Sequence, residues 1–316
     1  MQSEHSHLAR LEALAAFSGI LISIQSRANG ELSHRLNNSI EAAFISFSTG
    51  LIVLIFIALL NQRVRDGMGN LRSSLKNGAL PWWQIPAGSL GGVFVALQTQ
   101  VVPIIGVAIF SVASIAGQTA VSLFVDRVGL TGGGKKPITK RRIAAATITV
   151  LAVLLSVVDK LNLATFSIIA VLLALTSGAL VGVQRALNGQ INEHTKQSFS
   201  TSLLNFIMGT STLLIIWLVN IGFAHGKVSP LPSWNILLYL GGSIGVIYIA
   251  FSSTIVQHLG VLTFTLFSVG GTLIGSFLID LVIPTNGMKV TWYLFGGLAL
   301  TYLGVMIGGQ SRLFKR

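Results

Sequence analysis

The chain has 316 residues, of which 52% are hydrophobic and only 9% are charged, whereas a soluble domain carries about 25% charged residues. This composition excludes a water-soluble fold and predicts an all-α polytopic protein in a lipid bilayer. The net charge of +12 does not indicate a nucleic-acid partner, because the basic residues lie between hydrophobic runs and not on a soluble face.

Ten hydrophobic runs are long enough to cross a membrane, which takes roughly 20 apolar residues and at least about 17. They cover approximately residues 8–28, 40–60, 84–103, 106–125, 142–158, 163–184, 200–221, 235–256, 260–281 and 291–308. The third and fourth runs are joined tightly at 103–105, and the eighth and ninth at 257–259. The polar start "MQSEHSHLAR" has a mixed charge balance, unlike the basic start of a cleaved signal peptide, so we expect the first run to be retained as a span.

The distribution of basic residues predicts the orientation. Ten spans place both termini on one side of the membrane, and 16 of the 21 Lys and Arg residues fall on that side. Because basic residues favour the cytoplasmic side, both termini are expected to be cytoplasmic. Arg185 is counted among the 16, since the sixth run ends at Gln184 and leaves Arg185 in a loop.

A polar hexamer occurs twice, as "QSRANG" at 25–30 and as "QRALNG" at 184–189. A shift of 159 aligns 18–50 with 177–209 in nine identities without a gap, and a shift of 154 aligns later positions, including Asp126 with Asp280. The chain therefore reads as two five-helix repeats, 1–160 and 161–316. Because five is an odd number, the repeats are expected to be inverted, a plan typical of transporters that bind substrate where the repeats meet.

The pattern "SGxLxxxQxxxNG", followed by a Ser and then "FxxG", resembles the signature of the YdcZ-type inner-membrane exporter family, within the drug/metabolite transporter (DMT) superfamily. The stretch "GQTAVSLFVDRVGLTGGGKKPITKRR" at 117–142 is similar to another segment of that family. The second copy departs from the pattern, since Thr272 stands where Gln118 stands in the first. The resemblance implies a DMT/EamA-like fold of two fused units, a bacterial inner membrane and export.

Polar side chains within the spans are candidates for a substrate pathway, because an uncompensated amide in hydrocarbon costs several kcal/mol and should face a cavity or another helix. The two amides of each hexamer are four residues apart and share one helix face. An alternative interpretation is hydrogen bonding between helices, with Gly30 and Gly189 ending the helices. The candidates are Gln25, Asn29, Gln184, Asn188, Gln118, Ser46 and Asn205.

Asp126 and Asp280 are matched carboxylates near the ends of the fourth and ninth spans. A carboxylate at a helix C-terminus opposes the dipole of its own helix, so coupling to an ion or a proton is one interpretation. A boundary residue balanced by neighbouring basic residues is the interpretation that the sequence favours.

No feature of the sequence predicts a cofactor or an enzyme. The stretch "GLTGGGKK" at 129–136 nearly matches a phosphate-binding loop, but Lys136 replaces the Ser or Thr that holds magnesium, and the strand and helix that the motif needs are lacking. The histidines have no metal-ligand spacing, and cysteine is absent.

These features together favour a secondary active transporter that exports a small metabolite or drug-like compound by alternating access between inverted repeats. Two alternatives stay open, a passive channel and a membrane assembly subunit without transport activity. A channel would need rings of carbonyls or like charges, and the sequence shows no such filter. We expect a small-molecule substrate as partner, and a homodimer is a further expectation.

Overall fold

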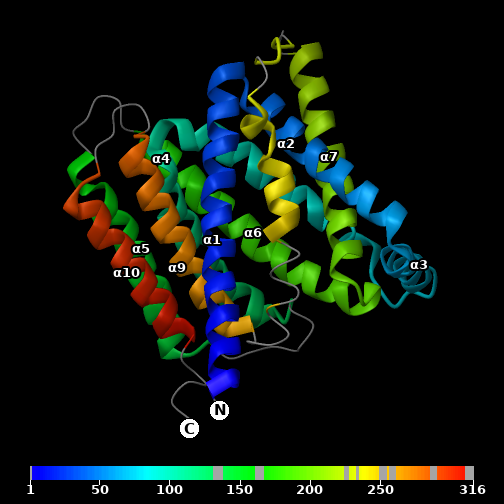
Figure 1. Ribbon diagram of the computed structural model, residues 1–316, viewed down its shortest axis with the longest axis horizontal. Coiled ribbons are helices and arrows are strands. Elements are labelled where there is room, and N and C mark those ends of the chain that lie inside the picture. Colours follow the sequence, from blue (N-terminus) through cyan, green and yellow to red (C-terminus); the bar gives the residue numbers. More distant parts are fainter. Residues whose placement is uncertain are drawn as a thin grey trace.

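The computed structural model describes residues 2–130, 138–160, 167–223, 228–232, 235–248, 255, 261–284 and 290–309. Its helices are α1 (Gln2–Leu36), α2 (Ser39–Leu60), α3 (Gln62–Lys76), α4 (Ala87–Val128), α5 (Lys140–Val157), α6 (Ile168–Thr195), α7 (Ser198–Phe223), α9 (Val261–Val282) and α10 (Trp292–Gly309). Residues 241–248 are also helical, and 3-10 turns cover Trp82–Gln84, Val158–Lys160 and Ile236–Tyr239. No strand occurs in these ranges, so the all-α expectation is confirmed. The start of α1 and the end of α10 lie at the same end of the bundle (Figure 1).

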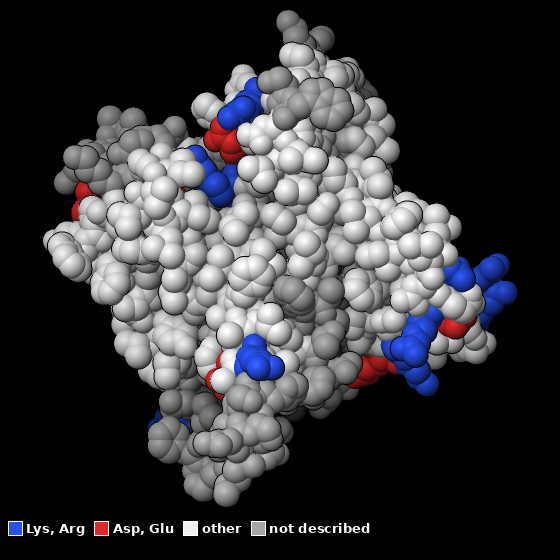
Figure 2. Space-filling view, in the orientation of Figure 1, with Lys and Arg blue, Asp and Glu red and all other residues white. Residues whose placement is uncertain are grey.

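The helices have the length and the surface of a membrane protein. Six helical stretches in the described ranges are long and apolar enough to cross a bilayer. One of them, Trp82–Val125, has 44 residues, about twice the number that one crossing needs. Leu60 and Ile169 leave 72% and 70% of their surface exposed, which suits contact with lipid. Figure 2 shows charged side chains in a few separate groups and an otherwise uncharged face.

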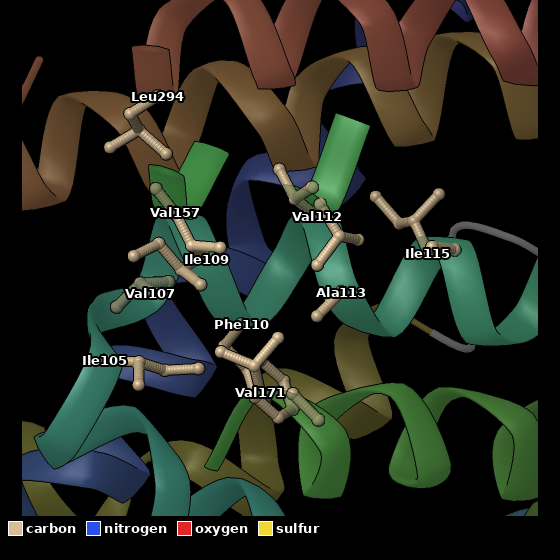
Figure 3. Packing of buried hydrophobic residues seen from close by; sticks show 14 of the residues in the cluster. Ile105, Val107, Ile109, Phe110, Val112, Ala113, Ile115, Val157, Val171 and Leu294 are labelled. Atoms are coloured by element: carbon tan, nitrogen blue, oxygen red, sulfur yellow. The ribbon is translucent and has the colours of Figure 1, made fainter. Parts of the chain in front are cut away.

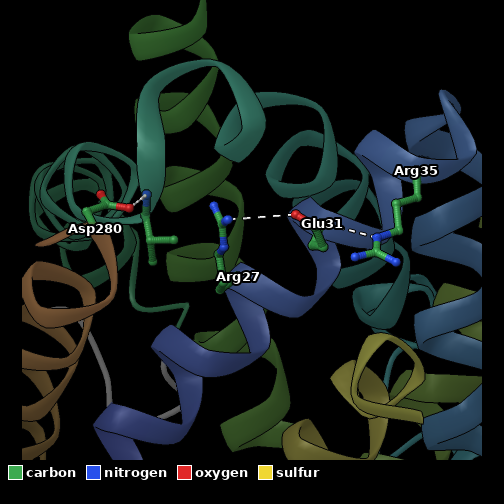
Figure 4. Close-up of polar contacts among 5 residues, drawn as sticks. Arg27, Glu31, Arg35 and Asp280 are labelled. Carbon is green, nitrogen blue, oxygen red and sulfur yellow. Dashed lines mark hydrogen bonds and ion pairs between the residues drawn. The ribbon is translucent and has the colours of Figure 1, made fainter. Parts of the chain in front are cut away.

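The third and fourth predicted spans form one long helix, α4, which is interrupted at Gly106. The backbone there adopts φ 82° and ψ 167°, a conformation that favours glycine. The break leaves the N–H groups of Val107 and Ala108 without acceptors in their own helix. Both donate to the carboxylate of Asp280 on α9, at 3.1 and 2.7 Å (Figure 4). The tight join expected at 103–105 is therefore a capped helix break.

The hydrophobic core surrounds this break. Ile105, Val107 and Ile109 are almost fully buried, and they belong to a cluster that also includes Val171 of α6 and Leu294 of α10 (Figure 3). Residues from the two halves of the sequence thus share one core, which fixes the position of the capped break between them.

Several helix pairs make backbone contact at glycines, and two of these contacts correspond to each other. A Cβ built on Gly19 of α1 would collide with the carbonyl oxygen of Ser268 on α9. A Cβ built on Gly178 of α6 would collide with the carbonyl oxygen of Ser114 on α4. The sequence shifts of 159 and 154 convert the first contact into the second, so the structure contains the same helix contact twice.

Three expectations from the sequence are wrong in detail. The first and sixth spans, expected at 8–28 and 163–184, extend to Leu36 and Thr195 as α1 and α6. Gly30 and Gly189 therefore do not end their helices. The segment expected to be a loop after the second span contains α3, whose buried residues Val64, Gly67 and Leu71 form one face and whose basic residues are exposed.

We expect Asp280→Ala to lower the free energy of unfolding by about 2 kcal/mol, because two buried N–H groups lose their acceptor. Asp280→Asn keeps one acceptor oxygen and should lose less. Thermal unfolding in detergent measures both changes. Asp66→Ala is the control, because its exposed carboxylate accepts only from the side chain of Gln62. Equal melting temperatures for Asp280→Ala and Asp66→Ala would contradict the capping role.

Candidate functional site

A cavity of about 640 Å³ lies where the two halves of the chain meet. Its lining residues come from α1, α2, α4, α6, α7, the helical residues 242–248 and α9. Many of them are polar, although they lie in a predominantly apolar bundle. The polar lining residues outside 242–248 are Gln25, Ser46, Gln184, Arg185, Asn188, Asn192, Ser198, Thr201, Ser202, Asn205 and Thr265.

Five of the seven predicted pathway residues line this cavity: Gln25, Ser46, Gln184, Asn188 and Asn205. They come from four different helices, and the structure brings them together. Gln25 lies within α1, as the predicted first run at 8–28 indicates, and the amide of Gln25 reaches the cavity. Whether these side chains contact a substrate stays a prediction.

The hydrogen bonds of this group leave part of its capacity unused. The amide nitrogen of Gln184 donates to Asn205 Oδ1 at 3.4 Å, and Asn205 Nδ2 donates to the carbonyl of Thr201 at 3.0 Å. Asn188 Oδ1 is buried and has no hydrogen-bond partner among the described residues. An acceptor of this kind is costly to leave unpaired, which favours a site that a ligand or water completes.

A smaller cavity of about 130 Å³ adjoins the first, since Ile22, Phe94 and Arg185 line both. Gln118 lines this smaller cavity, and its amide nitrogen is 3.4 Å from Ser114 Oγ. Six of the seven predicted pathway residues thus border one of two neighbouring cavities.

Asn29, the seventh, is sealed inside the protein. It is 0% exposed, and its amide nitrogen donates to Gln98 Oε1 at 3.0 Å. Gln98 in turn donates to Ser26 Oγ at 2.8 Å. A Cβ on the next residue, Gly30, would lie 2.7 Å from a methyl group of Val102. The segment of α1 beyond Gln25 is therefore closely packed.

The matching segment of α6 is open. Asn188 lines the large cavity, and a Cβ on Gly189 would meet no atom within 4 Å. Gln25 and Gln184 both reach the cavity, but only the α6 copy of the hexamer is accessible beyond its glutamine. The two copies of one sequence motif thus occupy different surroundings.

Charged side chains lie on α1 beyond the sealed segment. Glu31 pairs with Arg35 at 2.9 Å and approaches Arg27 at 3.7 Å (Figure 4).

Asp280 is not among the residues that line either cavity, and its two backbone contacts give it a structural role that the sequence did not suggest. The side chain of Asp126, its partner in the repeat, lies outside the described part of the chain.

The expectation that Arg185 belongs to a loop is wrong. This residue lies within α6 and not in a cytoplasmic loop, and it lines both cavities. The aromatic lining residues Phe94, Tyr248 and Phe264 were also missed. The position of Arg185 inside the repeated hexamer is the signal that points to it, since its neighbour Gln184 was predicted to lie on the pathway.

The described residues contain no group of three or more His, Asp or Glu that could hold a metal ion. The chemistry that the site offers is therefore hydrogen bonding by amides and hydroxyls, one guanidinium charge, and contact with aromatic rings.

Comparison with known proteins agrees with this architecture. The model of the family described as "Putative inner membrane exporter, YdcZ" matches the chain twice, at residues 11–155 and 169–307. A solved structure titled "Crystal structure of protein" has 15% sequence identity and a TM-score of 0.56, over 96% of each chain, which shows a similar fold. No curated protein matches the sequence.

The resemblance noted from the sequence is confirmed, because the two matches together span most of the chain and repeat one unit. The family is described as one of membrane exporters and not of enzymes. The chain belongs to the family described as "Putative inner membrane exporter, YdcZ", and it carries that family's unit twice.

Proposed function

We propose that the protein is a secondary active transporter that exports a small metabolite or drug-like compound across the bacterial inner membrane. Ten transmembrane helices in two inverted five-helix repeats, with both termini cytoplasmic, would carry out alternating access. The family match supports export, and the duplicated helix contact at Gly19 and Gly178 supports the repeat. The free energy would come from an ion gradient or from the gradient of the substrate.

One observation carries this proposal: the two copies of the hexamer have equivalent sequences but different surroundings. Asn29 and Gly30 are sealed, whereas Asn188 and Gly189 border a cavity. If the repeats are inverted, these copies lie toward opposite faces of the membrane. A cavity that reaches Asn188 and not Asn29 then gives access from one face only. Exchange of the two environments between the repeats would open the other face.

The open face is the cytoplasmic one in this proposal. The cavity extends to Asn192 and Ser198, next to the turn between α6 and α7. With both termini inside, that turn is cytoplasmic, and the sealed end of α1 faces outward. An exporter takes up its substrate in this conformation.

The other candidate functions have less support. A passive channel needs a continuous path, but the closely packed segment around Asn29 and Val102 closes one end. An assembly subunit does not need a polar cavity between its repeats. Saturable flux with counterflow in proteoliposomes distinguishes a transporter from both alternatives.

The substitution Gly189→Ala should reduce transport about tenfold or more while the protein stays folded. In the observed state an added methyl group meets no atom within 4 Å, and alanine favours a helix by roughly 0.5–1 kcal/mol. In the exchanged state Gly189 would take the surroundings of Gly30, where overpacking costs about 1–3 kcal/mol. Transport assays in proteoliposomes, together with melting temperatures, measure both effects.

Gly69→Ala is the matched control, because Gly69 is a helical glycine of α3 with no atom within 4 Å of an added Cβ. It should leave transport unchanged. Wild-type transport by Gly189→Ala would show that the surroundings of Gly189 do not change during the cycle.

The double substitution Gln25→Ala with Gln184→Ala should weaken transport by about tenfold, since each amide supplies hydrogen bonds of roughly 0.5–1.5 kcal/mol to the cavity. The melting temperature should fall by little more than the loss of the hydrogen bond between Gln184 and Asn205 would cause, because both side chains line the cavity. Gln62→Ala, on the exposed face of α3, is the control. Normal transport by the double variant would remove both glutamines from the pathway.

A further inference from the structure

Arg185 places a positive charge beside the two cavities. It is ten residues before the end of α6 at Thr195, which corresponds to about 15 Å along the helix. Its side chain is exposed at a position that borders both cavities. A guanidinium at membrane depth is costly unless a carboxylate, a carbonyl or water compensates it, and such residues normally serve a function.

No carboxylate of the described chain compensates this charge. The ion pairs of the described residues join Arg27 and Arg35 to Glu31, and Lys160 to Asp159. Among the described residues that line the two cavities, Arg185 is the only charged one. The described lining of the cavity therefore has a net positive charge and contains no acidic side chain that neutralises it.

The repeat shows that this charge is not needed for the helix contact. The shift of 159 pairs Arg185 with Ser26, which is 2% exposed and hydrogen-bonded to Gln98 and to the carbonyl of Ile22. The first copy thus forms its helix with a small neutral residue at this position. The first copy carries its arginine one position later, as Arg27, which approaches Glu31. Arg185 has no such carboxylate among the described residues and borders the cavities, which fits a role in binding better than a role in folding.

The surroundings of Arg185 indicate what kind of anion fits. A single guanidinium matches one carboxylate, which it binds through two parallel hydrogen bonds. The described residues of the lining include no second Lys, Arg or His for a doubly charged phosphate ester. Phe94, Tyr248 and Phe264 line the same cavity and offer an apolar surface for the rest of the molecule. A volume of about 640 Å³ accommodates a small ring or chain.

We propose that the cavity binds a small organic monocarboxylate, with its carboxylate on Arg185 and its apolar body against Phe94, Tyr248 and Phe264. This inference rests on the proposed function, because it names the substrate class of the same cavity. Gln184 would donate its amide to the anion.

Binding by the purified full-length protein tests the charge requirement. The probes are phenylacetate, indole-3-acetate and hexanoate, each with its primary amide, and phenyl phosphate. Because a hydrogen bond to a charged group contributes about 1.5–3 kcal/mol, the wild type should bind at least one acid about tenfold or more tightly than its amide. The measurement is the ligand-induced rise in melting temperature or a calorimetric Kd.

Arg185→Gln should abolish the preference for the acid and leave the affinity for the amide unchanged. Arg185→Lys should retain part of the preference for the acid, and it replaces Arg185→Gln in the binding test if that variant does not fold. Arg65→Gln, on the exposed face of α3, is the matched control and should bind as the wild type does. Equal affinity for acids and amides, no binding by any probe, tighter binding of phenyl phosphate, or an unchanged preference in folded Arg185→Gln would each overturn the inference.

Flux assays separate this inference from the proposed function. Acid-selective binding that depends on Arg185, without counterflow of the bound acid, would support the binding site and contradict transport. Counterflow of neutral or cationic compounds that Arg185→Gln leaves intact would support transport and contradict the monocarboxylate.

Discussion

Gly19 and Gly178 let two helix pairs approach until their backbones touch, in a bundle where lipid provides no hydrophobic drive for helices to associate. Close packing supplies the attraction there, so a side chain at either position would separate the helices. The packing of α1 against α9 and of α6 against α4 forms around these two glycines. The shared core surrounds the break at Gly106, and the carboxylate of Asp280 satisfies the N–H groups that the break exposes.

The same constraint gives the protein its polar interior. The amides of Gln184 and Gln25 pack against Gly91 and Gly245, where an added Cβ would collide with the first amide nitrogen and lie 3.3 Å from the second, and the same two glutamines border the cavity. Polar groups at this depth need partners, and the protein supplies them only in part. Asn188 Oδ1 and the guanidinium of Arg185 have no partner among the described residues, which is the condition of a cavity that receives a ligand.

Much of this architecture could be predicted from the sequence, because hydrophobic runs and a repeated motif can be recognised without knowing which residues contact one another. The aligned repeat indicated five residues that now line one cavity, and three of them belong to the hexamers. Arg185 was assigned to a loop because a polar turn of helix facing a cavity looks like the end of a hydrophobic run. The capping role of Asp280 depends on a contact across more than 170 positions of sequence, which no local pattern reveals. The different surroundings of Gly30 and Gly189 are a property of one conformation. The same sequence has to form both conformations of the proposed transport cycle, so it cannot show this difference.

The sealed segment of α1 and the open segment of α6 are expected to exchange their surroundings during transport. Cysteine labelling tests this exchange directly in a chain that has no cysteine. Ser33 and Asn192 are paired by the shift of 159, and Ser33 is buried whereas Asn192 lines the cavity. At rest, a membrane-impermeant reagent should label Asn192→Cys from the cytoplasmic side and leave Ser33→Cys unlabelled from outside. During turnover with a transported compound, Ser33→Cys should become accessible from outside while Asn192→Cys becomes protected. Labelling of Asn192→Cys from outside, or accessibilities that do not change during transport, would contradict the account.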